Sequence, residues 1–381
     1  HARLAAGGGA PAEIDAAAEQ LLAEIDAAET EDPGTRALLW AVRAWAAAAR
    51  GEPGARIAAL EALLRLPEQV RSRDEFVAAD ADTLWDAWLA YGKALGNRKH
   101  LLVGDDGPWY FAASEAYDER PFEARGLFAV LALTSRDAEH RALAHEYFAD
   151  LTRQRPGGLL LLRRLYLESG RFPSHAAVPE AVRHALVDQA LNAGDIDLAS
   201  ELTAGLTEPP PGADRVQWRM RRARALLLGG HPAAGLEALE ALVADAAELE
   251  GEGLDRLVQI LFDLQNLERH AKAVELFERL LALELDAKRR RELLFWTADS
   301  YRALDRHARA ALYYLRSATL PDPFAMDRWA QSARFQAAES LVRAGYLEDA
   351  RRLYRGLLNV TKDPAQRALL RRKIEQVEAR E

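Results

Sequence analysis

Two similar stretches of sequence decide the fold: residues 305–314 (DRHARAALYY) and residues 345–354 (GYLEDARRLY), which lie 40 residues apart. Each begins with a turn residue, has an alanine five residues later and ends in tyrosine. A small residue lets two helices approach closely, and a large apolar residue one helical turn later fills the space beside it. The spacing therefore predicts the second helix of a two-helix hairpin at both places.

The same pattern recurs along the second half of the chain. Small residues early in the predicted second helices recur at spacings of 36, 38, 37 and 40, at Ala199, Gly235, Ala273, Ala310 and Ala350. A turn residue stands five positions before each of them, at Gly194, Gly230, Glu268, Asp305 and Gly345. Glycine tolerates the left-handed conformation that often ends a helix. A single hairpin cannot bury its apolar face, so we expect the hairpins to stack.

Composition favours helices throughout the chain. Ala, Leu, Arg and Glu dominate, and these residues are strong helix formers. Short breaker segments, such as residues 32–34 and 321–323, separate the amphipathic stretches. We predict an all-α fold of about 16 to 18 helices joined by short turns.

The stretches 268–281, 305–314 and 345–354 resemble the second helix of a tetratricopeptide repeat. The resemblance covers about residues 180–365, with spacings longer than the roughly 34 residues of the family. The first-helix tryptophan of the family is missing from its usual place, so the repeats are degenerate. The resemblance implies a right-handed α-solenoid of stacked antiparallel helix hairpins.

We expect three segments along the chain. Residues 1–12 have the composition of a flexible linker, and residues 13–157 form a helical region of divergent repeats or a cap. Residues 158–381 form the repeat array, which ends in a capping helix. Within the second segment, Trp85 and Trp88 share one helix face and are expected in the core.

Charge and cysteine content exclude several classes of function. Lys and Arg number 50 against 59 Asp and Glu, a net charge of −9, which argues against nucleic acid as a partner. The absence of cysteine excludes disulfides and thiolate metal sites. No apolar run is long enough for a membrane span.

The chain starts at His1, and we expect a signal peptide or lipid anchor upstream. Together with the absence of cysteine, this start favours a periplasmic or outer-membrane-associated protein, with the cytoplasm as the alternative.

Neither of two motifs predicts catalysis or metal binding. His140 and His145 are five residues apart, which places their imidazoles on different faces of a helix. Glu168-Ser169 resembles the catalytic motif of lytic transglycosylases, but that family's further motifs do not follow. A helix that ends at Gly170 accounts for the same residues without catalysis. We expect no enzyme activity, no cofactor and no metal. Two alternatives stay open: a peptidoglycan-related envelope enzyme or its regulator, with Glu168 in a cleft, and a cytosolic peptide-sensing regulator.

In tetratricopeptide arrays the first helix of each hairpin lines the concave groove. The resemblance therefore implies a scaffold or adaptor whose partner is another protein, bound as an extended peptide or a helix. The candidate groove residues mix aromatics, amides and both charge signs, and they are His184, Asp188, Asn192, Gln217, Arg224, Asp255, Phe262, Gln265, Asn266, Phe295, Asp299, Arg302, Phe335, Glu339 and Arg343.

Overall fold

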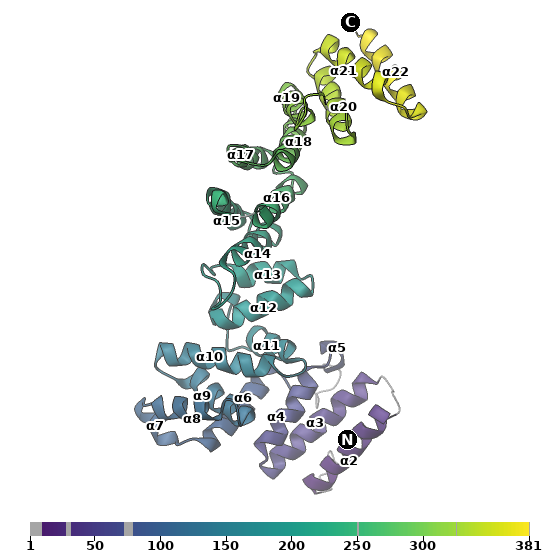
Figure 1. The fold of residues 1–381 in the computed structure, drawn as a ribbon. Helices are drawn as coiled ribbons and strands as arrows, with labels where there is room; N and C mark the ends of the chain where they lie inside the picture. Colours follow the sequence, from purple (N-terminus) through teal and green to yellow (C-terminus); the bar gives the residue numbers. More distant parts are fainter. Residues whose placement is uncertain (1–9, 28–31, 72–78, 250, 325, 381) are drawn as a thin grey trace. The chain divides into compact units, whose positions relative to one another are not determined.

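The computed structural model describes residues 10–27, 32–71, 79–249, 251–324 and 326–380 (Figure 1). These residues form 21 α-helices and two short 3₁₀-helices and contain no strand, so the prediction of an all-α fold is confirmed. The helices outnumber the 16 to 18 that we expected. The additional ones include α5 (Glu68–Arg71) and α7 (Arg98–Val103), which are too short for a 3.6-residue period to be recognised in the sequence.

The chain forms two compact units, His1–Pro210 and Pro211–Glu381. The boundary expected between residues 157 and 158 lies inside the first unit, between helices α10 (Ala138–Arg153) and α11 (Gly158–Leu167), which pack on each other. Of the expected linker, residues 1–9 lie outside the described residues, and helix α2 begins at Pro11. Among the described helices, none combines the length and the apolar character that a bilayer span requires.

The remaining helices of the first unit are α2 (Pro11–Ala27), α3 (Pro33–Arg50), α4 (Pro53–Leu64), α6 (Ala81–Leu95), α8 (Gly107–Ala116), α9 (Pro121–Thr134), α10 (Ala138–Arg153), α11 (Gly158–Leu167), α12 (Glu180–Asn192) and α13 (Ile196–Thr203). Trp85 and Trp88 on α6 are fully buried, which confirms their place in the core. The Trp85 ring stacks on Phe148 at 5.0 Å, and its indole nitrogen donates to the Leu165 carbonyl at 2.9 Å.

Helices α6 and α9 cross in backbone contact. A Cβ atom added to Gly92 would lie 2.0 Å from the carbonyl oxygen of Gly126, so only glycine fits there. The buried guanidinium of Arg125, beside this crossing, pairs with the buried Glu61 of α4 and lies 4.4 Å from the Trp88 ring centroid. A buried ion pair specifies one arrangement, because removing either partner leaves an uncompensated charge.

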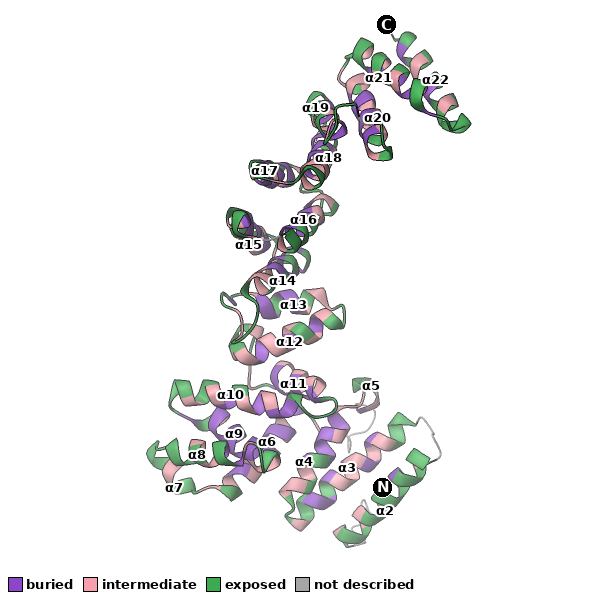
Figure 2. Cartoon of the chain, viewed as in Figure 1, coloured by how far each residue is buried: buried purple, intermediate pink, exposed green. Residues whose placement is uncertain are grey.

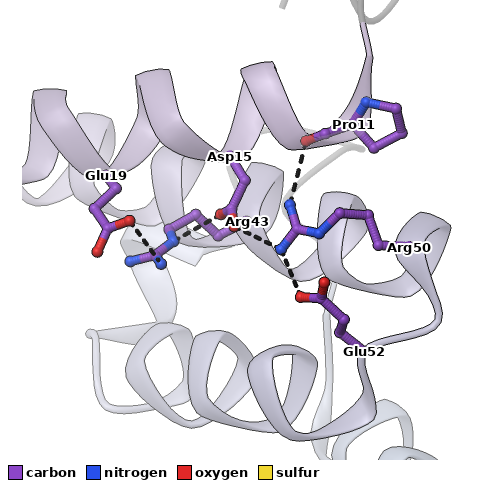
Figure 3. A network of polar contacts seen from close by, with 6 residues as sticks. All are labelled: Pro11, Asp15, Glu19, Arg43, Arg50 and Glu52. Carbon is purple, nitrogen blue, oxygen red and sulfur yellow. Dashed lines mark hydrogen bonds and ion pairs between the residues drawn. The ribbon is translucent and has the colours of Figure 1, made fainter.

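Helix α2 contacts α3 through ion pairs as well as a small apolar cluster of Ala18, Leu22 and Leu39. Figure 3 shows Asp15 of α2 between two arginines of α3, with Arg43 at 2.9 Å and Arg50 at 2.7 Å. Arg50 also reaches Glu52 at 2.8 Å. Burial opposes ionisation of Asp15, but the hydrogen bonds from the two arginines outweigh it and lower the pKa of this carboxyl group. Only Ala18 and Leu22 of α2 are buried, so its apolar contact with the unit is small.

The helices of the second unit are α14 (Arg215–Leu228), α15 (Pro232–Ala244), α16 (Gly251–Asn266), α17 (His270–Leu281), α18 (Ala287–Ala303), α19 (His307–Ala318), α20 (Arg328–Arg343), α21 (Leu347–Val360) and α22 (Pro364–Glu378). Each helix packs mainly on the next one or two in the chain (Figure 1). Such nearest-neighbour packing is typical of repeat proteins.

The five predicted turn residues, each at the junction between the two helices of a hairpin, have one common geometry. All five have positive φ, between 57° and 95°, including the two that are not glycine, Glu268 and Asp305. Each first helix ends two residues before the turn residue, and each second helix begins two residues after it. The amide following the turn residue donates to the carbonyl five residues earlier at 2.8 to 3.1 Å, which closes the first helix in a Schellman motif.

The small residues lie at the points where the helices of a hairpin meet. Ala199, Ala273, Ala310 and Ala350 are fully buried. The remaining small residue is Gly235. A Cβ atom there would lie 2.5 Å from the backbone nitrogen of Leu227, so the backbones of the two helices are in contact. The predicted register of these hairpins is thus the register of the structure.

We predict that Glu268→Gly stabilises the second unit by about 1 kcal/mol, because glycine adopts a left-handed conformation without the steric cost that a side chain adds. The reverse change, Gly345→Glu, should destabilise it by a similar amount. Space around Gly345 is open, so the backbone conformation alone would cause that loss. Urea unfolding followed by circular dichroism measures the change in unfolding free energy for each variant. A neutral or opposite change would contradict the conclusion that the left-handed conformation of the turn residue limits stability.

Candidate functional site

The fifteen candidate groove residues lie on the first helices of five hairpins. His184, Asp188 and Asn192 belong to α12 of the first unit, and the other twelve belong to α14, α16, α18 and α20 of the second.

A cavity of about 200 Å³ lies between α16 and α18, two consecutive first helices. Its apolar floor is formed by Leu254, Val258 and Leu293, which are all buried. Charged and amide side chains line the rest: Asp255, Gln259, Asp286, Lys288, Arg289 and Glu292. An apolar floor with a few polar groups around it suits one side chain of a bound peptide.

Asp255, a predicted site residue, forms one wall of this cavity through an ion pair between the helices. Arg289 of α18 binds its carboxylate with two nitrogens, Nε at 2.6 Å and Nη2 at 3.0 Å, and also binds Asp286 at 2.5 Å. The hydrogen bond from Arg289 lowers the pKa of Asp255. Because the pair is exposed it stabilises the fold little, but it fixes the direction of both side chains.

Among the polar lining residues, only Asp255 was predicted as a site residue, and five were not: Gln259, Asp286, Lys288, Arg289 and Glu292. A signal for Gln259 was present, because it stands four residues after Asp255 and so shares its helix face. Lys288 and Glu292 stand near the start of α18, where the repeat pattern assigns no position.

The predicted aromatic residues lie between helices. Phe262 packs on Trp296 with ring centroids 5.1 Å apart, and Phe295 packs on Trp329 at the same distance. Phe335 packs edge-on against Tyr354 at 5.9 Å. All three phenylalanines are half-buried, so they hold neighbouring helices together and leave only part of each ring for a partner.

Three of the predicted polar residues also have partners within the unit. The Gln265 amide nitrogen donates to the Trp296 carbonyl at 2.8 Å and to the Ser300 hydroxyl at 2.7 Å. The hydroxyl groups of Tyr314 and Tyr354 donate to Asp299 and Glu339, respectively, across their hairpins.

Burial, followed by the nearby carboxylate, raises the pKa of both tyrosines. Asp299 also pairs with Arg302 at 2.7 Å, and Glu339 with Lys373 at 2.8 Å. These two carboxylates therefore support the hairpins, whatever else they contact. Arg224 likewise pairs with Asp263 of α16 at 2.8 Å.

The more exposed members of the set are Asp188, Asn192, Gln217, Arg224, Asp255, Asn266, Arg302 and Arg343, and His184 is half-buried. Burial lowers the pKa of His184, which favours its neutral form.

The residues weighed for metal binding and catalysis have other contacts. His140 binds Asp106 at 3.0 Å, whereas His145 is buried and binds the Tyr166 hydroxyl at 2.9 Å. Within the described residues, no three histidine or carboxylate side chains gather as metal ligands would. Glu168 is exposed at the end of α11 and pairs with Arg164, so it does not lie in a cleft as the catalytic acid of that motif would.

No protein-family model matches the chain, and no curated protein is significantly similar to it.

Because His145 is buried, we predict that the free energy of unfolding falls as the pH is lowered. Burial lowers its pKa from 6.5 to about 4, so below pH 6.5 the unfolded chain binds a proton that the folded chain does not. This group should therefore cost about 3 kcal/mol of stability between pH 7 and pH 4. In unfolding measured across that range, His145→Gln should lose correspondingly less stability than the unmodified protein; equal losses would contradict the assignment.

Proposed function

We propose that this protein is a non-enzymatic scaffold that binds another protein through the first helices of its second unit. The observation that carries this proposal is the cavity between α16 and α18, with its apolar floor and polar walls. A partner segment lying across the two helices would place one apolar side chain in this cavity.

The chemistry of the cavity walls suits a peptide. The exposed Gln259 has an amide that can both donate to and accept from a peptide backbone. Lys288 and Glu292 provide one charge of each sign, which suits recognition of a polar flank. Apolar anchoring inside a polar rim is the usual arrangement of a protein interface.

The proposed architecture is a solenoid of the tetratricopeptide type. The four hairpins of the second unit share one junction geometry and pack mainly on their neighbours, which supports this proposal. In such an array the first helices of successive hairpins form one continuous face, which is the face that carries the cavity.

The proposed setting is the bacterial cell envelope, with the protein in the periplasm or at the outer membrane. The absence of cysteine from all 381 residues supports it, because stray thiols are avoided in oxidising compartments.

A charge reversal in the cavity tests the proposal. Glu292→Lys places a cation beside Lys288, so binding of a partner that contacts this wall should weaken about tenfold or more. The matched control is Glu275→Lys on α17, an exposed position with the same change of charge.

Both variants and the unmodified protein would be used to capture partners from envelope and cytosol fractions of the native host. A partner identified by mass spectrometry and lost only with Glu292→Lys would support the proposed face and its compartment. A partner retained equally by Glu292→Lys would place its binding elsewhere.

A further inference from the structure

A second cavity lies in the first unit, where the end of α6 meets α7, α8 and α9. Its volume is about 340 Å³, which is enough for a long side chain and falls within the size range of small-ligand sites.

The floor of this cavity is apolar and rigid. Trp109, Ala116 and Leu127 form it, and all three are buried. The Trp109 indole nitrogen donates to the Asn97 carbonyl at 3.0 Å. Gly96 lies against the indole ring, because a Cβ atom there would be 2.6 Å from it. The ring therefore has one position, and it presents a fixed apolar surface to whatever enters.

The rim of the cavity carries more negative than positive charge. Glu115 of α8 and Glu123 of α9 line it, and the one guanidinium among the lining residues, that of Arg120, pairs with Glu123 at 2.8 Å. The unit as a whole has 21 basic against 33 acidic residues, a net charge of −12. Local and long-range charge both attract a cationic partner.

Exposed apolar side chains stand beside the cavity. Phe111 lies next to the lining residue Ala112, at the edge of the α8 face that lines the cavity, and its side chain is 65% exposed. On α7, Leu102 and Val103 are 78% and 76% exposed. Helix α7 contains no buried residue (Figure 2). Several large apolar side chains exposed around one cavity indicate an interaction surface.

We propose that this cavity is a second recognition site, separate from the groove of the second unit, for a basic amphipathic segment of a partner protein. A lysine or arginine of the segment enters the cavity, with its aliphatic stem on Trp109 and Leu127 and its charge at Glu115 and Glu123. Apolar residues of the same segment cover Phe111 and the end of α7.

The test uses the full-length protein and two labelled peptides. One is a short amphipathic helix of leucine and arginine, and the other has glutamate in place of each arginine. Fluorescence anisotropy should show binding of the arginine peptide and much weaker binding of the glutamate peptide. Glu115→Arg should weaken binding of the arginine peptide about tenfold or more. The charge-matched control, Glu146→Arg at an exposed position of α10, should change it less than about twofold.

Two further variants separate the causes. Phe111→Ser keeps the charge and should also weaken binding, because it removes the apolar contact. Glu292→Lys, in the second unit, is the converse variant: a peptide whose binding is weakened by Glu292→Lys but not by Glu115→Arg is bound at the proposed groove, so failure of this proposal and failure of the proposed groove are distinguishable. The proposal is overturned if the unmodified protein binds neither peptide or both alike, or if Glu146→Arg weakens binding as much as Glu115→Arg.

Discussion

The hairpins described by the repeat pattern depend on one backbone constraint: the residue between their helices must adopt a left-handed conformation. With that conformation, the following amide closes the first helix, and the second helix begins two residues after the turn residue. The small residue of each second helix then lies opposite the first helix. Gly235 shows how tight this contact is, since no Cβ atom fits against Leu227. Where Glu268 and Asp305 occupy the turn, packing imposes a conformation that their side chains disfavour.

The candidate groove follows from that constraint. Because the junctions are alike, α16 and α18 reach the same face of the second unit, and Arg289 can bind Asp255 across the gap between them. Buried apolar residues of α16 and α18 form the floor of the cavity, and longer polar side chains stand at its edge. Gln265 of α16 is hydrogen-bonded to Trp296 and Ser300 of α18, and side chains that are already held in place lose little entropy when a partner binds.

The junctions could be predicted from sequence because each depends on a few residues at fixed spacing. The cavity could not, because it joins side chains from two separate stretches, residues 254–259 and 286–293, whose relative positions depend on packing. For the same reason the sequence did not show that Asp299 and Glu339 bond to tyrosines within their hairpins. In the first unit, helices were recognisable, but the contact of α6 with α9 depends on Gly92 meeting Gly126, which no local pattern indicates.

The central claim is that a partner protein binds across α16 and α18. Hydrogen exchange measured by mass spectrometry, with and without a partner purified from the host, tests it most directly. Binding at the cavity should slow exchange at the cavity-lining ends of α16 and α18 in the complex, with little change in α15 and α17. A complex in which α16 and α18 exchange as they do in the free protein would contradict it.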